Sequence, residues 1–150
     1  MARAIALSLQ NVRSGKGGPF AALVVKAGRI LAEAANIVTS ANDPTAHAEI
    51  VAIRAACRKL STFELRDCEI YASCEPCPMC LGAIYWARPA RIYFAARSAD
   101  AAKIGFDDSL IYGELKKPFA RRKIRMSQLM REEALKAFQL WEENPAKMRY

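Results

Sequence analysis

The chain has 150 residues, of which 53% are hydrophobic and 25% charged, and its formal net charge is +8. These values predict one domain over residues 1–150 with a sizeable core, and no apolar run approaches the roughly 20 residues that a membrane span needs. Five cysteines are an odd number, and three of them lie between positions 74 and 80. This pattern favours metal-bound thiolates in a reducing cytoplasm over a disulfide framework.

Hydrophobic periodicity and turn residues predict alternating helices and strands. Helices are expected over 3–13, 44–60, 78–87 and 128–142, and strands over 20–26, 29–35, 69–73, 91–95 and, as a short edge strand, 123–126. The first helix has Ile5, Leu9 and Val12 on one face. Asp43 and Pro44 are typical of an N-cap and a first helical residue. Strands that alternate with helices in this order predict an α/β fold with a mixed sheet.

Two segments carry residues suited to metal chemistry. Cys77 and Cys80, in a Pro-Cys-x-x-Cys sequence, follow a predicted strand and open a helix, where the helix dipole favours thiolates. His47, the only histidine in the sequence, lies just inside the start of another predicted helix. Both helices should begin at the same sheet edge, so these three side chains are expected to meet. They would bind Zn²⁺ and leave a fourth tetrahedral position for water.

Glu49 is not needed as a ligand and is well placed to move protons for that water. It lies two residues after His47, which would put the two side chains on different faces of a mature helix, but both can reach a metal off the helix end. A His-x-Glu followed by Pro-Cys-x-x-Cys is the signature of zinc nucleobase deaminases, so hydrolytic deamination is expected. The alternatives are a purely structural zinc closed by Cys74, and a zinc-stabilised binding module; both leave Glu49 without a role.

At these residues the chain resembles the cytidine deaminase-like superfamily and, more narrowly, its bacterial guanine deaminases. The matching segments run nearly end to end and are 17–20, 42–49, 73–88 and 105–109. A departure is Ala21-Ala22 after Phe20, where a glycine is expected. The resemblance implies a three-layer α/β/α sandwich around a five-stranded mixed sheet, one zinc per subunit and a homodimer. It further implies that residues 127–150 are exchanged between subunits, and that guanine is hydrolysed to xanthine and ammonia.

The resemblance also assigns residues to the substrate. Guanine presents N1–H and a 2-amino group, a paired donor edge that a carboxylate accepts. Asp107 and Asp108 both offer a carboxylate, and the family pattern selects Asp108, which would also assist proton transfer; the alternative is a loop aspartate that caps the next helix. Asn36, at the end of the hairpin, offers a donor and an acceptor to the base, or simply forms a turn.

Three further residues are candidate substrate contacts: Ala48, Trp86 and Tyr150. Trp86 would wall the base pocket, although an aromatic at that helical position is as often part of the core. The terminal Tyr150 would fray by default, and only an exchanged tail makes it a lid over the partner's site.

The main rival function is tRNA adenosine deaminase, which shares the zinc motif and acts on a flipped anticodon base. The basic residues of segment 116–125 favour it, but a solvated surface is the preferred interpretation of that segment. Asp108 discriminates against it, because adenine lacks the N1–H of guanine. Guanine is therefore the favoured partner over nucleic acid, no membrane partner is expected, and cytosine or an aminotriazine stays open as a substrate.

Overall fold

The computed structural model describes residues 1–149. Its internal contacts divide the chain into two compact units, Met1–Ser109 and a second that begins at Leu110. The first unit contains the sheet and the helices that pack on it, and all the predicted site residues except Tyr150 lie in it. No helix among the described residues is long and apolar enough to cross a membrane.

The sheet of the described chain has four strands in the order β2-β1-β3-β4. They are β1 (Ala21–Lys26), β2 (Arg29–Ala35), β3 (Cys68–Cys74) and β4 (Arg91–Ala96). Strand β1 is antiparallel to both β2 and β3, whereas β3 and β4 are parallel. The prediction of a mixed α/β sheet is therefore confirmed, and each of these four strands lies within one residue of its expected bounds.

The expected fifth strand, and with it the five-stranded sheet, is wrong for this chain. Residues 123–126 have no regular structure, and the Ile124 side chain in their midst is 81% exposed. A strand forms only where its backbone N–H and C=O groups find a neighbouring strand. Within residues 1–149 this segment pairs with none, and a charged residue on either side of Ile124 favours solvent over burial.

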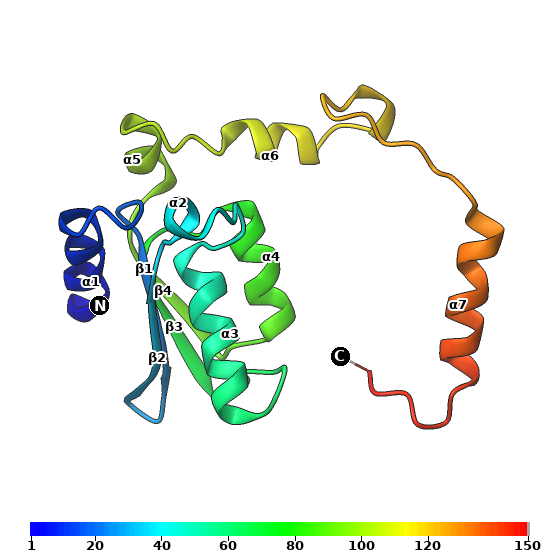
Figure 1. Cartoon of the computed structure of the whole chain (residues 1–150), viewed down its shortest axis with the longest axis horizontal. Coiled ribbons are helices and arrows are strands. Elements are labelled where there is room, and N and C mark those ends of the chain that lie inside the picture. Colours follow the sequence, from blue (N-terminus) through cyan, green and yellow to red (C-terminus); the bar gives the residue numbers. More distant parts are fainter. Residues whose placement is uncertain (150) are drawn as a thin grey trace. The chain divides into compact units, whose positions relative to one another are not determined.

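Helices cover both faces of the sheet (Figure 1). Helix α1 (Ala2–Arg13) contacts β1, β2 and β3 on one face, and α3 (Ala48–Leu60) and α4 (Pro78–Ala87) cover the other. The core between the sheet and these two helices combines a few large side chains with many alanines, and its largest fully buried members include Leu65, Ile70 and Val24. Small side chains at these contacts let α3 approach the sheet closely.

The face that α1 turns to the sheet is not the expected one. The three apolar residues with helical spacing are 41–52% exposed: Ile5, Leu9 and Val12. The buried residues of α1 are instead Ala4, Ser8 and Asn11. The small side chains of Ala4 and Ser8 let α1 lie close to the sheet. The Asn11 amide can be buried beside them because it finds hydrogen-bond partners there.

The second long helix begins later than predicted. Helix α3 starts at Ala48 with His47 as its N-cap, and not at Pro44. The Oδ1 atom of Asp43 instead accepts hydrogen bonds from the backbone N–H of Thr45 (2.8 Å) and from its hydroxyl (2.7 Å), which closes a separate turn. His47 therefore lies at the helix mouth in an extended backbone conformation, and its ring is not tied to the helix side.

The remaining elements are short, apart from the last helix. Helices α2 (Val38–Ala41), α5 (Ser98–Lys103) and α6 (Ser109–Leu115) and the 3₁₀ turn η1 (Phe119–Arg121) lie outside the predicted helices and strands. Helix α7 (Arg131–Glu143) replaces the predicted helix over 128–142, since the left-handed Met130 delays its start. Helices α6 and α7 bury none of their described residues.

Candidate active site

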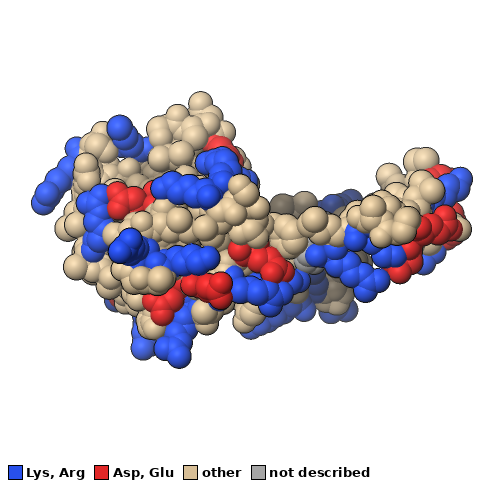
Figure 2. All heavy atoms as spheres, turned by 90° about the horizontal axis from the view of Figure 1, so that it is seen from below, with Lys and Arg blue, Asp and Glu red and all other residues tan. Residues whose placement is uncertain are grey.

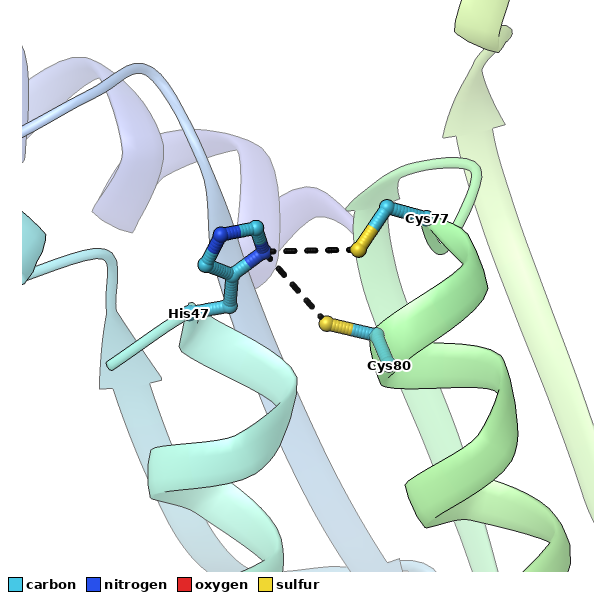
Figure 3. Close-up of side chains that lie close together, drawn as sticks. All are labelled: His47, Cys77 and Cys80. Carbon is cyan, nitrogen blue, oxygen red and sulfur yellow. Dashed lines mark hydrogen bonds between the residues drawn. The ribbon is translucent and has the colours of Figure 1, made fainter. Parts of the chain in front are cut away.

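The N-termini of α3 and α4 lie together at one end of the sheet, and this brings the three predicted ligands into contact (Figure 3). His47 is the N-cap of α3, Cys77 is the N-cap of α4, and Cys80 lies in the first turn of α4. The Sγ atoms of Cys77 and Cys80 are each 3.5 Å from Nδ1 of His47. Zn–S bonds of about 2.3 Å and a Zn–N bond of about 2.0 Å at tetrahedral angles require an S···N separation of about 3.5 Å. Both distances from His47 to the sulfurs therefore match those of a bound zinc ion, and the three ligand atoms lie within 4.8 Å of one another.

Hydrogen bonds within this group concentrate negative charge on one sulfur. The Cys80 thiol and the His47 ring both bond to Cys77 and lower the pKa of its thiol to about 4. The pKa of Cys80 is raised, chiefly because its proton is held by the Cys77 sulfur, and the pKa of His47 is raised by its bond to Cys77. The N–H groups at the start of α4 stabilise the thiolate further. A cation is thus the natural complement of this site.

Glu49 lies in the first turn of α3 and is only 8% exposed. Burial raises the pKa of its carboxyl group, and the nearby charge of Cys77 raises it further. A carboxyl group whose pKa is raised toward neutrality can both take and return a proton under working conditions. Its place beside the ligands, without being needed as one, agrees with the expected proton-transfer role.

Cys74 does not close the metal site. Among the described residues, the group able to hold a metal consists of His47, Cys77 and Cys80. Cys74 is buried at the end of β3, and its Sγ lies 3.6 Å from the carbonyl oxygen of Arg97 as a hydrogen-bond donor. The described geometry therefore favours three protein ligands with an open position, which is typical of catalytic zinc rather than structural zinc.

The two adjacent aspartates of the 105–109 loop have different roles. Asp107 Oδ1 accepts a hydrogen bond from the backbone N–H of Ser109 at 2.9 Å, and so it satisfies the first turn of α6 and has its pKa lowered by that bond. Asp108 has its pKa raised, first by burial and then by the nearby charge of Cys77. The hydrogen bond to Ser109 thus occupies Asp107, whereas Asp108 lies close enough to Cys77 to be influenced by its charge.

Asn36 follows the end of β2 and is held in place by hydrogen bonds. It is only 6% exposed, and its backbone N–H donates to the carbonyl oxygen of Phe20 at 2.9 Å. Its Oδ1 accepts from the backbone N–H of Val38 at 3.2 Å, which fixes the side-chain amide. The next backbone N–H, of Ile37, donates to the carbonyl oxygen of Ala46 at 3.1 Å and so ties this strand end to the residue before His47.

The other predicted substrate contacts differ in position. Ala48 is fully buried as the first residue of α3, where backbone N–H groups have no acceptor within the helix. Trp86 is 65% exposed and lies six residues beyond Cys80, about 9 Å further along α4, so one chain does not bring it to the metal ligands. Tyr150 lies outside the described residues. The substrate roles of all three stay predictions.

Three features next to the site are absent from the sequence-based predictions. The rings of Phe20 and Phe106 pack edge to face with centroids 4.9 Å apart. Gly17 approaches the strand end so closely that an added Cβ would lie 2.1 Å from the carbonyl oxygen of Asn36. Asn11 reaches the same carbonyl from α1. The run Gly17-Gly18-Pro19-Phe20 was the available signal, since paired glycines often mark close backbone approach.

Residues 1–96 match the family model described as the cytidine and deoxycytidylate deaminase zinc-binding region. The chain belongs to this family of zinc-binding deaminases. Within the family, it is 53% identical to guanine deaminase of Bacillus subtilis over 148 residues, which cover 99% of this chain and 95% of that one. An X-ray structure of guanine deaminase from the same organism superposes with a TM-score of 0.96, again covering 99% of this chain and 95% of that one.

More distant deaminases match with lower similarity or over less of the chain. A solved structure of guanine deaminase from Nitrosomonas europaea has a TM-score of 0.68 and 33% identity, and the match covers 91% of this chain and 69% of that one. The tRNA-specific adenosine deaminase of Aquifex aeolicus is 46% identical over 78 residues, 52% of each chain. This match covers about half of the chain, whereas the match to the guanine deaminase of Bacillus subtilis covers nearly all of it.

Proposed function

We propose that this protein is a zinc-dependent guanine deaminase, which hydrolyses guanine to xanthine and ammonia. The observation that supports the proposal is the environment of Asp108: burial and the nearby charge of Cys77 raise its pKa, while Asp107 is bonded to the backbone N–H of Ser109. Guanine offers N1–H and a 2-amino group as a paired donor edge, which a carboxylate accepts through both oxygens. Near-full-length similarity to a guanine deaminase supports the same substrate.

The chain's own residues supply orientation and proton transfer. His47, Cys77 and Cys80 hold the zinc, which when bound supplies a Lewis acid that activates water at neutral pH. Asp108 accepts the donor edge of guanine and so directs its 2-amino carbon toward the metal side of the site. Glu49 takes a proton from water and passes it to a ring nitrogen of the base. As the C–N bond breaks, it moves the proton of the newly added hydroxyl group to the amino group, which leaves as ammonia; its raised pKa allows both transfers.

Asn36 and Ala48 complete the substrate site in this proposal. The amide of Asn36, fixed by Val38, presents its donor to the purine edge opposite Asp108. The backbone N–H of Ala48 lies at the mouth of α3, where the helix dipole favours a negatively polarised oxygen of the base. Trp86 walls the base only if a second chain brings its ring to the site.

We propose further that the chain acts as one cytoplasmic domain in a homodimer, with residues 127–150 exchanged between subunits. Helix α7 buries no residue in the single chain, although Phe138 (70% exposed) and Trp141 (44%) belong to its apolar face. An amphipathic helix is stable when its apolar face is covered, and a second copy would cover it. Tyr150 would then close the partner's site, and a truncation ending before Pro145 that retains full guanine turnover would refute this role.

A tRNA adenosine deaminase is the second candidate, favoured by the basic segment 116–125. The view in Figure 2 shows basic side chains interspersed with acidic ones rather than gathered into one field. Within the segment, Lys117 pairs with Glu114 at 2.5 Å, and Arg122 lies 4.6 Å from the ring centroid of Phe119. These contacts support a solvated surface rather than an RNA-binding one.

The experiment that separates the two functions measures ammonia release from guanine and, separately, from a tRNA anticodon stem-loop with adenosine at the target position. Wild-type zinc protein, Glu49→Ala and Asp108→Ala are compared. Release from guanine alone, lost in both variants at full zinc content, supports the proposal. Ammonia release from the stem-loop alone refutes the proposal. If neither substrate releases ammonia, another aminated heterocycle is the substrate to test.

A further inference from the structure

Asn11 is a buried polar residue on the sheet-facing side of α1, in a position where helices usually bury an apolar side chain. It is 5% exposed. Its Nδ2 atom donates to the carbonyl oxygen of Gly18 and to the carbonyl oxygen of Asn36, both at 2.8 Å. The two N–H groups of one amide therefore join two segments that are far apart in the sequence.

These two segments are also bonded to each other. The backbone N–H of Asn36 donates to the carbonyl oxygen of Phe20 at 2.9 Å, and the N–H of Phe20 donates to the carbonyl oxygen of Gly18 at 2.8 Å. Gly17 packs so closely against Asn36 that no side chain fits between them. Asn11 thus closes a network in which the 17–20 turn and the end of β2 hold fixed positions.

Both segments continue into the proposed base site. An added Cβ at Gly18 would lie 3.3 Å from the Phe20 ring and 3.4 Å from the Phe106 ring, so the turn is in contact with the loop that carries Asp108. On the other side, the strand end provides the Asn36 side chain. One amide on α1 is therefore connected to both edges of the site, although it is not itself a ligand or a proton carrier.

We propose that Asn11 is a positioning residue for the substrate base, acting through Asn36 and through the 17–20 turn. The inference rests on the proposed function, because it assigns the base-contacting role to Asn36. The carbonyl oxygens of Gly18 and Asn36 each accept a hydrogen bond from the same atom, and the amide nitrogen of Asn11 has the two N–H groups that this needs. A carboxylate of the same shape offers only acceptors to them, and an alanine leaves both without this partner.

The test compares guanine kcat/KM in the zinc-loaded wild type, Asn11→Ala and Asn11→Asp. We expect a loss on the order of 10- to 100-fold in both variants, mainly in KM, with one zinc per chain retained, since small displacements of positioning groups have effects of this size. The matched control is Ser8→Ala, which removes another buried polar group of α1; within residues 1–149 its hydroxyl bonds to the Ile5 carbonyl of the same helix and to no other element. Its kcat/KM should stay within twofold of the wild type.

A double-mutant cycle with Asn36→Ala separates positioning from general destabilisation. If Asn11 acts through Asn36, Asn11→Ala reduces kcat/KM much less in the Asn36→Ala background than in the wild type. Equal reductions in both backgrounds would overturn the inference, as would unchanged kcat/KM in both Asn11 variants while the wild type turns over guanine.

Hydrogen exchange gives a readout that does not depend on the substrate. The backbone N–H groups of Phe20 and Asn36 should exchange at least tenfold faster in Asn11→Ala, with the N–H of Ile70 in the central strand β3 unchanged as the reference. Unchanged exchange at Phe20 and Asn36 overturns the inference. If the wild type does not turn over guanine but Asn11→Ala still shows faster exchange at Phe20 and Asn36, the proposed substrate is overturned and the positioning role stays supported.

Discussion

The close approach of Gly17 to the end of β2 allows a quantitative prediction for Gly17→Ala. An alanine Cβ would lie 2.1 Å from the carbonyl oxygen of Asn36 and 3.0 Å from its carbonyl carbon. Cβ atoms are essentially never closer than 3.0 Å to such atoms, so the two backbones must separate by about 1 Å. That carbonyl oxygen is also the acceptor of Asn11, 2.8 Å away, and a shift of this size breaks the hydrogen bond.

The expected cost in free energy of unfolding follows from these two effects. Overpacking a tight site costs about 1–3 kcal/mol, and losing a buried hydrogen bond adds about 1 kcal/mol. The sum, about 2–4 kcal/mol, lowers the Tm of a 150-residue chain by roughly 5–15 °C. Because the displaced atoms flank Asn36, guanine kcat/KM should fall by about 100-fold.

The assays are thermal unfolding followed by circular dichroism and ammonia release from guanine, both with the zinc-loaded protein. The control is Gly113→Ala in α6, where an added Cβ meets no atom within 4 Å. A helical glycine replaced by alanine should keep or raise stability, by up to about 1 kcal/mol. A Gly17→Ala protein with wild-type Tm and wild-type turnover would show that the two backbones do not meet as described.

Three further predictions concern the metal site. Glu49→Gln should keep one zinc per chain by elemental analysis but lose a factor of about 10²–10⁴ in kcat, since it removes the proton-transfer group; loss of zinc along with activity would make Glu49 a structural residue. Asp108→Asn should lower guanine kcat/KM by roughly 10- to 150-fold, the equivalent of one charge-assisted hydrogen bond of about 1.5–3 kcal/mol, and an unchanged value would remove Asp108 from substrate recognition. In metal-free protein at pH 6, iodoacetamide should modify Cys77 before Cys74. The pKa of Cys77 is lowered to about 4, so its thiolate predominates above that pH, whereas burial raises the pKa of Cys74. Zinc should protect Cys77, and mass spectrometry that finds Cys74 modified first would contradict the assigned charge state.

Local sequence signals predicted most of the secondary structure of the first unit. The Ala27-Gly28 turn and the Pro-Cys-x-x-Cys start of α4 both lie where expected, because a tight turn and a helix N-terminus depend on residues next to one another. The start of α3 was predicted four residues too early. Asp43 and Pro44 suit an N-cap and a first helical residue equally well in a helix or in an isolated turn, and the sequence does not distinguish the two.

Elements whose formation depends on distant partners were predicted less well. The apolar stripe of α1 indicated the wrong buried face, because Asn11 meets carbonyl groups from segments 7 and 25 residues away. The expected strand over 123–126 has a suitable sequence but no neighbouring strand in the described chain. The spacing of apolar residues along a segment shows which side chains could be buried together. Whether they are buried depends on a surface that other parts of the chain provide.

The sequence by itself determined the chemistry of this protein. Its single histidine, its Pro-Cys-x-x-Cys motif and Glu49 specify a zinc-dependent hydrolytic deaminase, because ligand type and helix N-terminal placement are local properties. Only the tertiary structure decided the distances and hydrogen bonds around the site. It set the 3.5 Å separations between His47 and the two sulfurs, and it bonded Asp107 to the backbone N–H of Ser109 at the start of α6. It also placed Asn11 against the strand end, since such contacts arise from the packing of helices on a common sheet and leave no pattern along the chain.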